Sequence, residues 1–97
     1  MVRLSRNNSV SVGTSIVQVS EATRRSSFSI MNTGATTVYI YLSDTEGAAT
    51  GSGIVLLPNA ALTDSNGGDY KCWQGRISAL SSGAGGTLAV FENLSGE

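Results

Sequence analysis

Apolar and polar residues alternate in short segments along most of this chain, and this alternation is the period of a half-buried β-strand. Residues 37–43 show it most clearly, because Val38 and Ile40 fall on one face and Tyr39 and Tyr41 fall on the other. No comparable stretch repeats its apolar residues at the spacing of an amphipathic helix. The pattern therefore predicts an all-β protein.

Residues 26–32 alternate in the same way, with Phe28 and Ile30 on one face. The sequence Asn32-Thr33-Gly34 follows, and both Asn and Gly accept the positive φ angles of tight turns. Because segment 37–43 begins soon afterwards, we predict that the two segments form a hairpin.

Further short segments recur at intervals of about ten residues, a spacing typical of sandwiches and barrels. We expect strands at 10–19, with a break at Gly13, and at 54–57, 61–63, 70–73, 76–81 and 87–92. Loops rich in Gly, Ser, Asn and Asp separate them, at 44–53, 64–69 and 82–86. This arrangement predicts a single small antiparallel β-sandwich, or a flattened barrel, of about seven to eight short strands.

A chain of 97 residues corresponds to one domain. Met1 to Ser9 is polar and has no period, so we expect an N-terminal arm at residues 1–9 and the sandwich domain at residues 10–97. The apolar positions of the expected strands predict the core, which comprises Ile16, Phe28, Ile30, Val38, Ile40, Leu42, Ile54, Leu56, Leu62, Ile77, Leu88 and Val90.

Charged residues are few, at 13% of the chain, and the formal net charge is −1. The basic residues are scattered apart from Arg24-Arg25, so the sequence offers no surface for nucleic acid. Low charge with many hydroxyl groups disfavours solubility of a free monomer. We therefore expect a homo-oligomer, a dimer or a trimer, with much of its surface in contact with other proteins.

The first residues contain no apolar run of signal-peptide length, and no segment reaches the roughly 20 apolar residues of a membrane helix. We therefore expect a protein made in the cytoplasm of its host without an export signal, and no membrane partner.

The residues that usually carry catalysis are absent or scattered. The chain has no histidine, so a Ser-His-Asp or Cys-His site cannot form. Cys72 is the single cysteine, and its apolar surroundings favour a small core residue over a reactive thiol. The seven acidic residues lie mostly in turns. The loop that begins at Asp64 departs from a calcium loop, because Gly68 stands where a ligand is needed, Asp69 stands where the sharp-turn glycine belongs, and Gly75 replaces the closing Glu. We predict no enzyme activity, no metal site and no cofactor.

Three features point to interaction instead. Tyr39 and Tyr41 share one face of a strand, where they either bind a protein or a sugar or cover the sheet. Trp73 is either a third binding residue or part of the core. Arg3 and Arg6 lie in the expected arm, which either holds a neighbouring subunit or is disordered.

One motif runs through most of the chain. Residues 25–34 have the form R-x-S-x-x-I-x-N-x-G and lead into Val38-Tyr39-Ile40. A G-I-x-L-x-P segment follows at residues 53–58, then an aromatic-glycine-I-x-A-L-S segment at 73–81, and a G-T-x-x-V strand at 86–90. This order resembles a recurring β-sandwich module of small virion proteins in tailed bacteriophages.

The resemblance implies a structural protein of the virion without catalytic residues. Its first implication is a capsid decoration, or cement, protein that binds the major capsid protein or another virion protein on the capsid surface. Its alternative implication is a fibre- or tail-associated module that binds a receptor or a glycan. The motif transfers no binding residue, because its repeated positions are core and turn positions.

Overall fold

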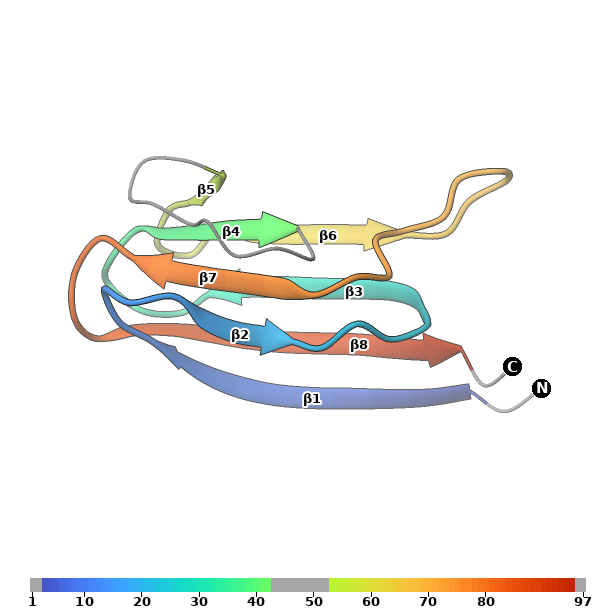
Figure 1. The fold of residues 1–97 in the computed structure, drawn as a ribbon, viewed down its shortest axis with the longest axis horizontal. Helices are drawn as coiled ribbons and strands as arrows, with labels where there is room; N and C mark the ends of the chain where they lie inside the picture. Colours follow the sequence, from blue (N-terminus) through green and yellow to red (C-terminus); the bar gives the residue numbers. More distant parts are fainter. Residues whose placement is uncertain (1–2, 43–52, 96–97) are drawn as a thin grey trace.

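The computed structural model describes residues 3–42 and 53–95, which form eight strands in two facing sheets (Figure 1). Sheet A contains, in spatial order, β1 (Arg3–Val12), β8 (Gly86–Ser95), β3 (Arg25–Asn32) and β6 (Ala61–Ser65). Sheet B contains β2 (Val17–Ser20), β7 (Ile77–Ser81), β4 (Val38–Leu42) and β5 (Ile54–Leu56). All neighbouring strands are antiparallel, so the predicted antiparallel β-sandwich is confirmed.

The strand order is that of a jelly roll. The first strand pairs with the last, the second with the seventh, the third with the sixth and the fourth with the fifth. These pairs alternate between the two sheets, as they do when one long antiparallel ribbon is wrapped around a core. Within the described residues there is no helix with the length and apolar character needed to cross a bilayer.

The hairpin predicted from segments 26–32 and 37–43 is wrong. β3 belongs to sheet A and β4 to sheet B, so the connection between them crosses from one layer to the other. The buried side chain of Asn32 holds this crossing, because its Nδ2 donates to the carbonyls of Thr36 (2.7 Å) and Leu56 (2.9 Å). The break predicted at Gly13 is a second crossing between the sheets, from β1 to β2.

The polar arm expected over residues 1–9 is not separate from the sandwich where the structure describes it. Residues 3–9 belong to β1 and pair in register with β8. This part of β1 is polar because it is an edge strand whose inward residues Arg6 and Asn8 lie at the open side of the sandwich. Only Val10 and Val12, further along, reach the core. A polar edge strand and a polar arm have the same composition, so the sequence alone did not distinguish them.

The segment expected as a strand at residues 70–73 forms only an isolated bridge, between Tyr70 and Gly67. Side chains of the preceding loop bond its backbone instead. Asn66 Oδ1 accepts the Cys72 N–H (2.9 Å), and Asp64 Oδ2 accepts the Trp73 N–H (3.1 Å). These hydrogen bonds to side chains take the place of backbone pairing with a neighbouring strand.

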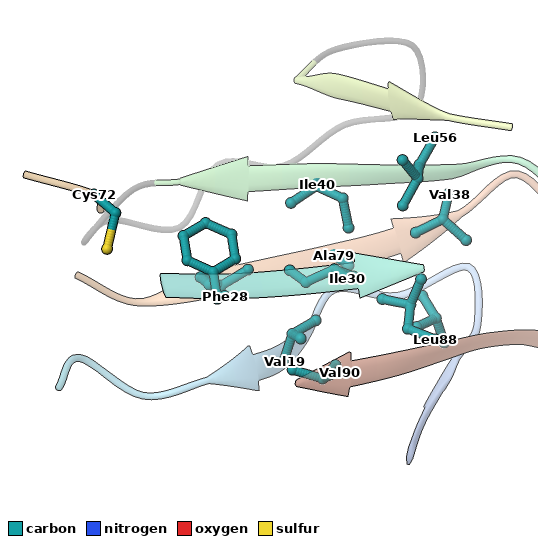
Figure 2. Close-up of a cluster of buried hydrophobic side chains, with 12 residues drawn as sticks. Val19, Phe28, Ile30, Val38, Ile40, Leu56, Cys72, Ala79, Leu88 and Val90 are labelled. Atoms are coloured by element: carbon teal, nitrogen blue, oxygen red, sulfur yellow. The ribbon is translucent and has the colours of Figure 1, made fainter. Parts of the chain in front are cut away.

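The core lies between the sheets and contains most of the predicted apolar residues (Figure 2). Phe28 and Ile30 of β3 face Ile40 and Ala79 of sheet B. Ile54 and Ile16 are exceptions. Ile54 lies on the edge strand β5 and is exposed, and Ile16, half-buried before β2, is not part of the core cluster. The structure also adds core residues that the prediction lacked, namely Val12, Val19 and Ala79.

Candidate protein-contact face

The outward residues of sheet A form a flat, uncharged surface. In β3 and β8 the residues Phe28, Ile30, Leu88 and Val90 turn inward, so the residues between them turn outward. The register of the four strands places three rows of outward residues side by side: Ser5, Asn93, Ser27 and Ser65; Asn7, Phe91, Ser29 and Thr63; and Ser9, Ala89, Met31 and Ala61. We call these residues the sheet A face, and none of them carries a charge.

The centre of the sheet A face is apolar. Phe91 is 37% exposed and Met31 is 43% exposed, although both are large hydrophobic side chains. Phe91 lies opposite Ser29 and Met31 lies opposite Ala89, so the two side chains are diagonal neighbours on adjacent strands. Asn7 and Ser29 flank Phe91 on the neighbouring strands, and Ala89 and Ala61 flank Met31.

A shallow depression of about 370 Å³ opens next to Phe91. Its lining consists of Ser27, Phe28, Ser29, Thr63, Asp64, Ser65 and Phe91. Hydroxyl groups both donate and accept hydrogen bonds, and the ring of Phe91 supplies an apolar wall. The depression therefore has the chemistry to receive one side chain, or one ring, of a binding partner.

Two features of the sheet A face match the centre of a protein interface, namely the absence of charged residues and the exposed side chains of Phe91 and Met31. Such centres are poor in charged residues and rich in aromatic residues and Met, with polar groups around them. A side chain that fills a pocket at the centre commonly dominates the binding energy. The sheet A face combines an uncharged surface with exposed apolar side chains beside a depression, and so it is a candidate contact surface in the described part of the chain.

A buried ion-pair network lies at the end of the sandwich where β3 begins. Arg25 is 1% exposed and Glu92 is 2% exposed. Arg25 Nε donates to Glu92 Oε2 (2.6 Å), Ser20 Oγ donates to the same oxygen (2.7 Å), and Arg6 Nη2 donates to Glu92 Oε1 (2.7 Å). The network joins β1, β2, β3 and β8.

Arg25 also holds the loops at this end. Its Nη1 donates to the carbonyls of Trp73 (2.9 Å) and Gly75 (3.1 Å), and its Nη2 donates to the carbonyl of Glu21 (2.8 Å) and to Ser20 Oγ (3.1 Å). With the bond from Nε to Glu92, all five N–H donors of the guanidinium have acceptors. The contacts of this network therefore hold strands and loops together and stabilise the fold.

Hydrogen bonds determine the protonation of Glu92. Burial alone would raise its pKa, but the donors from Ser20, Arg25 and Arg6 and the charge of Arg25 outweigh burial, so the pKa is lowered. A lowered carboxyl pKa contributes stability that is present above the ordinary glutamate pKa of about 4.3 and is lost as the pH falls through the lowered value.

We therefore expect the free energy of unfolding to decrease as the pH is lowered below about 4, and the Glu92→Gln variant to lose much of this dependence. Urea unfolding followed by tryptophan fluorescence at several pH values measures it. Glu21→Gln, at an exposed position, is the matched control and should keep the wild-type slope. An unchanged slope in Glu92→Gln would contradict the assignment.

The residues predicted to bind partners do not come together. Tyr39 and Tyr41 lie on the outer side of sheet B, half-buried, beside the buried Leu80 and Ser78 of β7. This placement leaves open both expectations for them, a binding surface or a cover for the sheet. They lie on the side of the sandwich opposite the sheet A face.

Trp73 is half-buried, packs against the core, and donates from Nε1 to the carbonyl of Arg76 (2.9 Å). Arg6 donates to Glu92, and Arg3 lies at the start of β1, where its side chain is outside the described residues. The predicted binding residues thus occupy separate regions and form no single site.

The Asp64 loop and Cys72 both make contacts that hold the fold. Asp64 accepts hydrogen bonds from the Tyr70 hydroxyl (2.8 Å) and the Trp73 N–H, which close the loop after β6. The described residues contain no group of three or more acidic, His or Cys side chains that could hold a metal ion. Cys72 is 2% exposed, and burial raises the pKa of its thiol, so the prediction of a core residue is confirmed.

Sequence reasoning missed the sheet A face, although a signal for it was present. The alternation that assigns Leu88 and Val90 to the core also assigns Phe91 to the opposite side. The sequence does not reveal that Phe91 and Met31 are neighbours, because β3 and β8 are far apart in the chain.

No protein-family model, curated protein or solved structure matches this chain.

Proposed function

We propose that this protein is a structural protein of a tailed-bacteriophage particle that binds the outer surface of the capsid through its sheet A face. The observation that carries the proposal is the uncharged face with Phe91 and Met31 at its centre. The motif at residues 25–34 supports the assignment to virion proteins. The jelly-roll strand order supports it by analogy, since viral capsid and lectin domains use this fold.

In this role the protein stabilises the capsid by contact alone. A flat face that covers the boundary between two capsid subunits binds both and opposes their separation. Burial of Phe91 and Met31 supplies affinity, and the surrounding hydroxyl groups of Ser and Thr pair with backbone and side-chain groups of the capsid. No residue of the sheet A face is charged, and the Asp64 carboxylate beside the depression already accepts hydrogen bonds from Tyr70 and Trp73, so we expect binding that depends little on ionic strength.

The proposed role requires no catalysis. The buried charged groups, Arg25 and Glu92, are bonded to each other and to loop carbonyls, so they are used to hold the fold. The major capsid protein is the proposed partner, and the proposed location is the capsid surface.

The proposal predicts that Phe91→Glu weakens binding to particles at least about thirtyfold, because a charge would be buried at the centre of the contact. Co-sedimentation of the purified protein with particles that lack it measures the affinity. Val55→Glu, an exposed apolar residue of β5 outside this face, is the matched control and should bind like the wild type. Absence of the protein from purified particles, or wild-type binding by Phe91→Glu, would overturn the proposal.

The depression beside Phe91 favours a second candidate function, in which a fibre- or tail-associated copy binds a sugar. A ring flanked by Ser27, Ser29, Thr63 and Ser65 offers both stacking and hydroxyl contacts to a saccharide. A glycan array with wild type and Phe91→Glu separates the two functions. Saccharide binding that Phe91→Glu abolishes, without binding to capsids, would support the second.

A further inference from the structure

β1 is the longest strand at an edge of either sheet. It spans Arg3–Val12 and pairs with β8 without a register shift, and its other side has no neighbouring strand in the part of the chain that the structure describes. The other edge strands have five residues (β6), four residues (β2) and three residues (β5), and the pairing of β2 is irregular. A long and regular free edge is where another strand adds most readily.

A hydrogen bond of Ser9 identifies the backbone groups of β1 that point outward. The Ser9 N–H donates to Asn8 Oδ1 (2.9 Å), which belongs to its own strand. Because backbone groups alternate in direction along a strand, the odd-numbered residues of β1 present their N–H and C=O groups to the free edge, while the even-numbered residues bond to β8. The free edge therefore carries a row of donors and acceptors.

We propose that a second copy of this chain pairs with this edge in antiparallel fashion, about a two-fold axis at Asn7. Hydrogen-bonded positions of such a pair must join outward groups to outward groups, so odd-numbered residues face odd-numbered residues. Centring on Asn7 places Ser5 of one copy opposite Ser9 of the other. The overlap covers residues 3–11 and supplies about ten hydrogen bonds, as many as a typical specific interface has.

The charges along β1 favour this register. A register centred on Arg6 would place two guanidinium groups opposite each other, whereas the Asn7-centred register places Arg6 opposite Asn8 of the second copy. When Ser9 donates to the second copy, Asn8 Oδ1 is released from the Ser9 N–H and can accept from that Arg6. The net charge of −1 per chain adds little repulsion between copies.

The inner side of the edge has space for side chains of an added strand. A groove of about 210 Å³ lies beside β1, lined by Arg6, Asn8, Gln18, Val19, Ser20, Glu21, Val90 and Glu92. The even-numbered side chains of the second β1 point to this side. The resulting dimer joins two copies of sheet A into one sheet of eight strands, with the two sheet A faces continuous. The proposed pairing does not depend on the proposed capsid role.

Disulfide cross-linking tests the register directly. In the proposed dimer, Asn7 faces Asn7 of the second copy with Cα atoms about 5.5 Å apart, within the range of a disulfide. We expect the Asn7→Cys variant to form a covalent dimer under mild oxidation. The matched control Ser9→Cys should not, because its two copies would be about 13 Å apart along the strands. Equal cross-linking of both variants, or none by Asn7→Cys, would overturn the proposal.

Sedimentation analysis of two further variants tests the edge itself. Ser9→Pro removes an outward N–H that β8 does not use and should convert the dimer to a monomer. Ser9→Ala keeps that N–H and should remain dimeric. A wild-type monomer at all concentrations, or a dimer that Phe91→Glu dissociates and Ser9→Pro does not, would overturn the β1 pairing. Either result leaves the binding of single copies to capsids as a separate question.

Discussion

The Arg25→Met variant is expected to lose about 3–5 kcal/mol of the free energy of unfolding, the cost of removing one partner from a buried ion pair. Methionine fills much of the volume of the arginine stem but donates no hydrogen bond. The substitution leaves the carboxylate of Glu92 without its shortest partner and the loop carbonyls of Glu21, Trp73 and Gly75 without their donors. A domain of this size has about 5–15 kcal/mol of stability in total, so the variant should be close to unfolding at 37 °C.

Urea unfolding followed by circular dichroism measures this loss. Arg24→Met, at the exposed neighbouring position, is the matched control and should change the stability by no more than about 1 kcal/mol, the upper end for an exposed charged contact. Arg25→Lys should recover only part of the loss, because an ammonium group cannot reach acceptors on β2, β8 and the loop before β7 together. A loss below about 1 kcal/mol in Arg25→Met would show that the network contributes little.

The second large effect is expected for Asn32→Asp, at the other end of β3, with a loss of about 2–4 kcal/mol at neutral pH. The Asn32 side chain is fully buried, and its Nδ2 donates to the carbonyls of Thr36 and Leu56 while its Oδ1 accepts the Gly34 N–H (3.0 Å). The substitution keeps the shape and the acceptor but places a carboxylate oxygen against two carbonyl oxygens.

The pH dependence separates this explanation from simple misfolding. The new carboxyl group would have a raised pKa, because burial and two facing acceptors favour its protonated form. Part of the lost stability should therefore return as the pH falls, the opposite trend to that expected for Glu92 in the wild type. The matched control is Asn93→Asp, at a half-buried position of the sheet A face, with an expected loss of at most about 1 kcal/mol. The same loss at every pH in Asn32→Asp would contradict the mechanism.

The sandwich was predictable from the sequence, because alternation reveals which residues turn inward. The neighbours of each strand were not, since β3 and β4 have the same alternation whether they pair in one sheet or face each other across the core. The Asn-Thr-Gly segment suggested a tight turn, but the outcome depends on the long-range bond from Asn32 to Leu56. Such a contact has no local signature.

The buried network was partly visible in the sequence. Glu92 continues the inward series of Leu88 and Val90, which was a signal that a carboxylate turns toward the core. Arg25 was hidden, because strict alternation from Phe28 places it outward. The register shift between Arg25 and Ser27 in the pairing of β3 with β8 turns its side chain inward.

The position of β8 between β1 and β3 has a consequence for how the chain is made. β8 is the last of the eight described strands to leave the ribosome, yet it lies inside sheet A and separates the first strand from the third. Until it has emerged, β1 has no partner in its sheet, and the inward side chains of both layers remain exposed to water. Folding of the sandwich therefore waits until β8 has emerged and depends on contacts between distant parts of the chain, which form slowly.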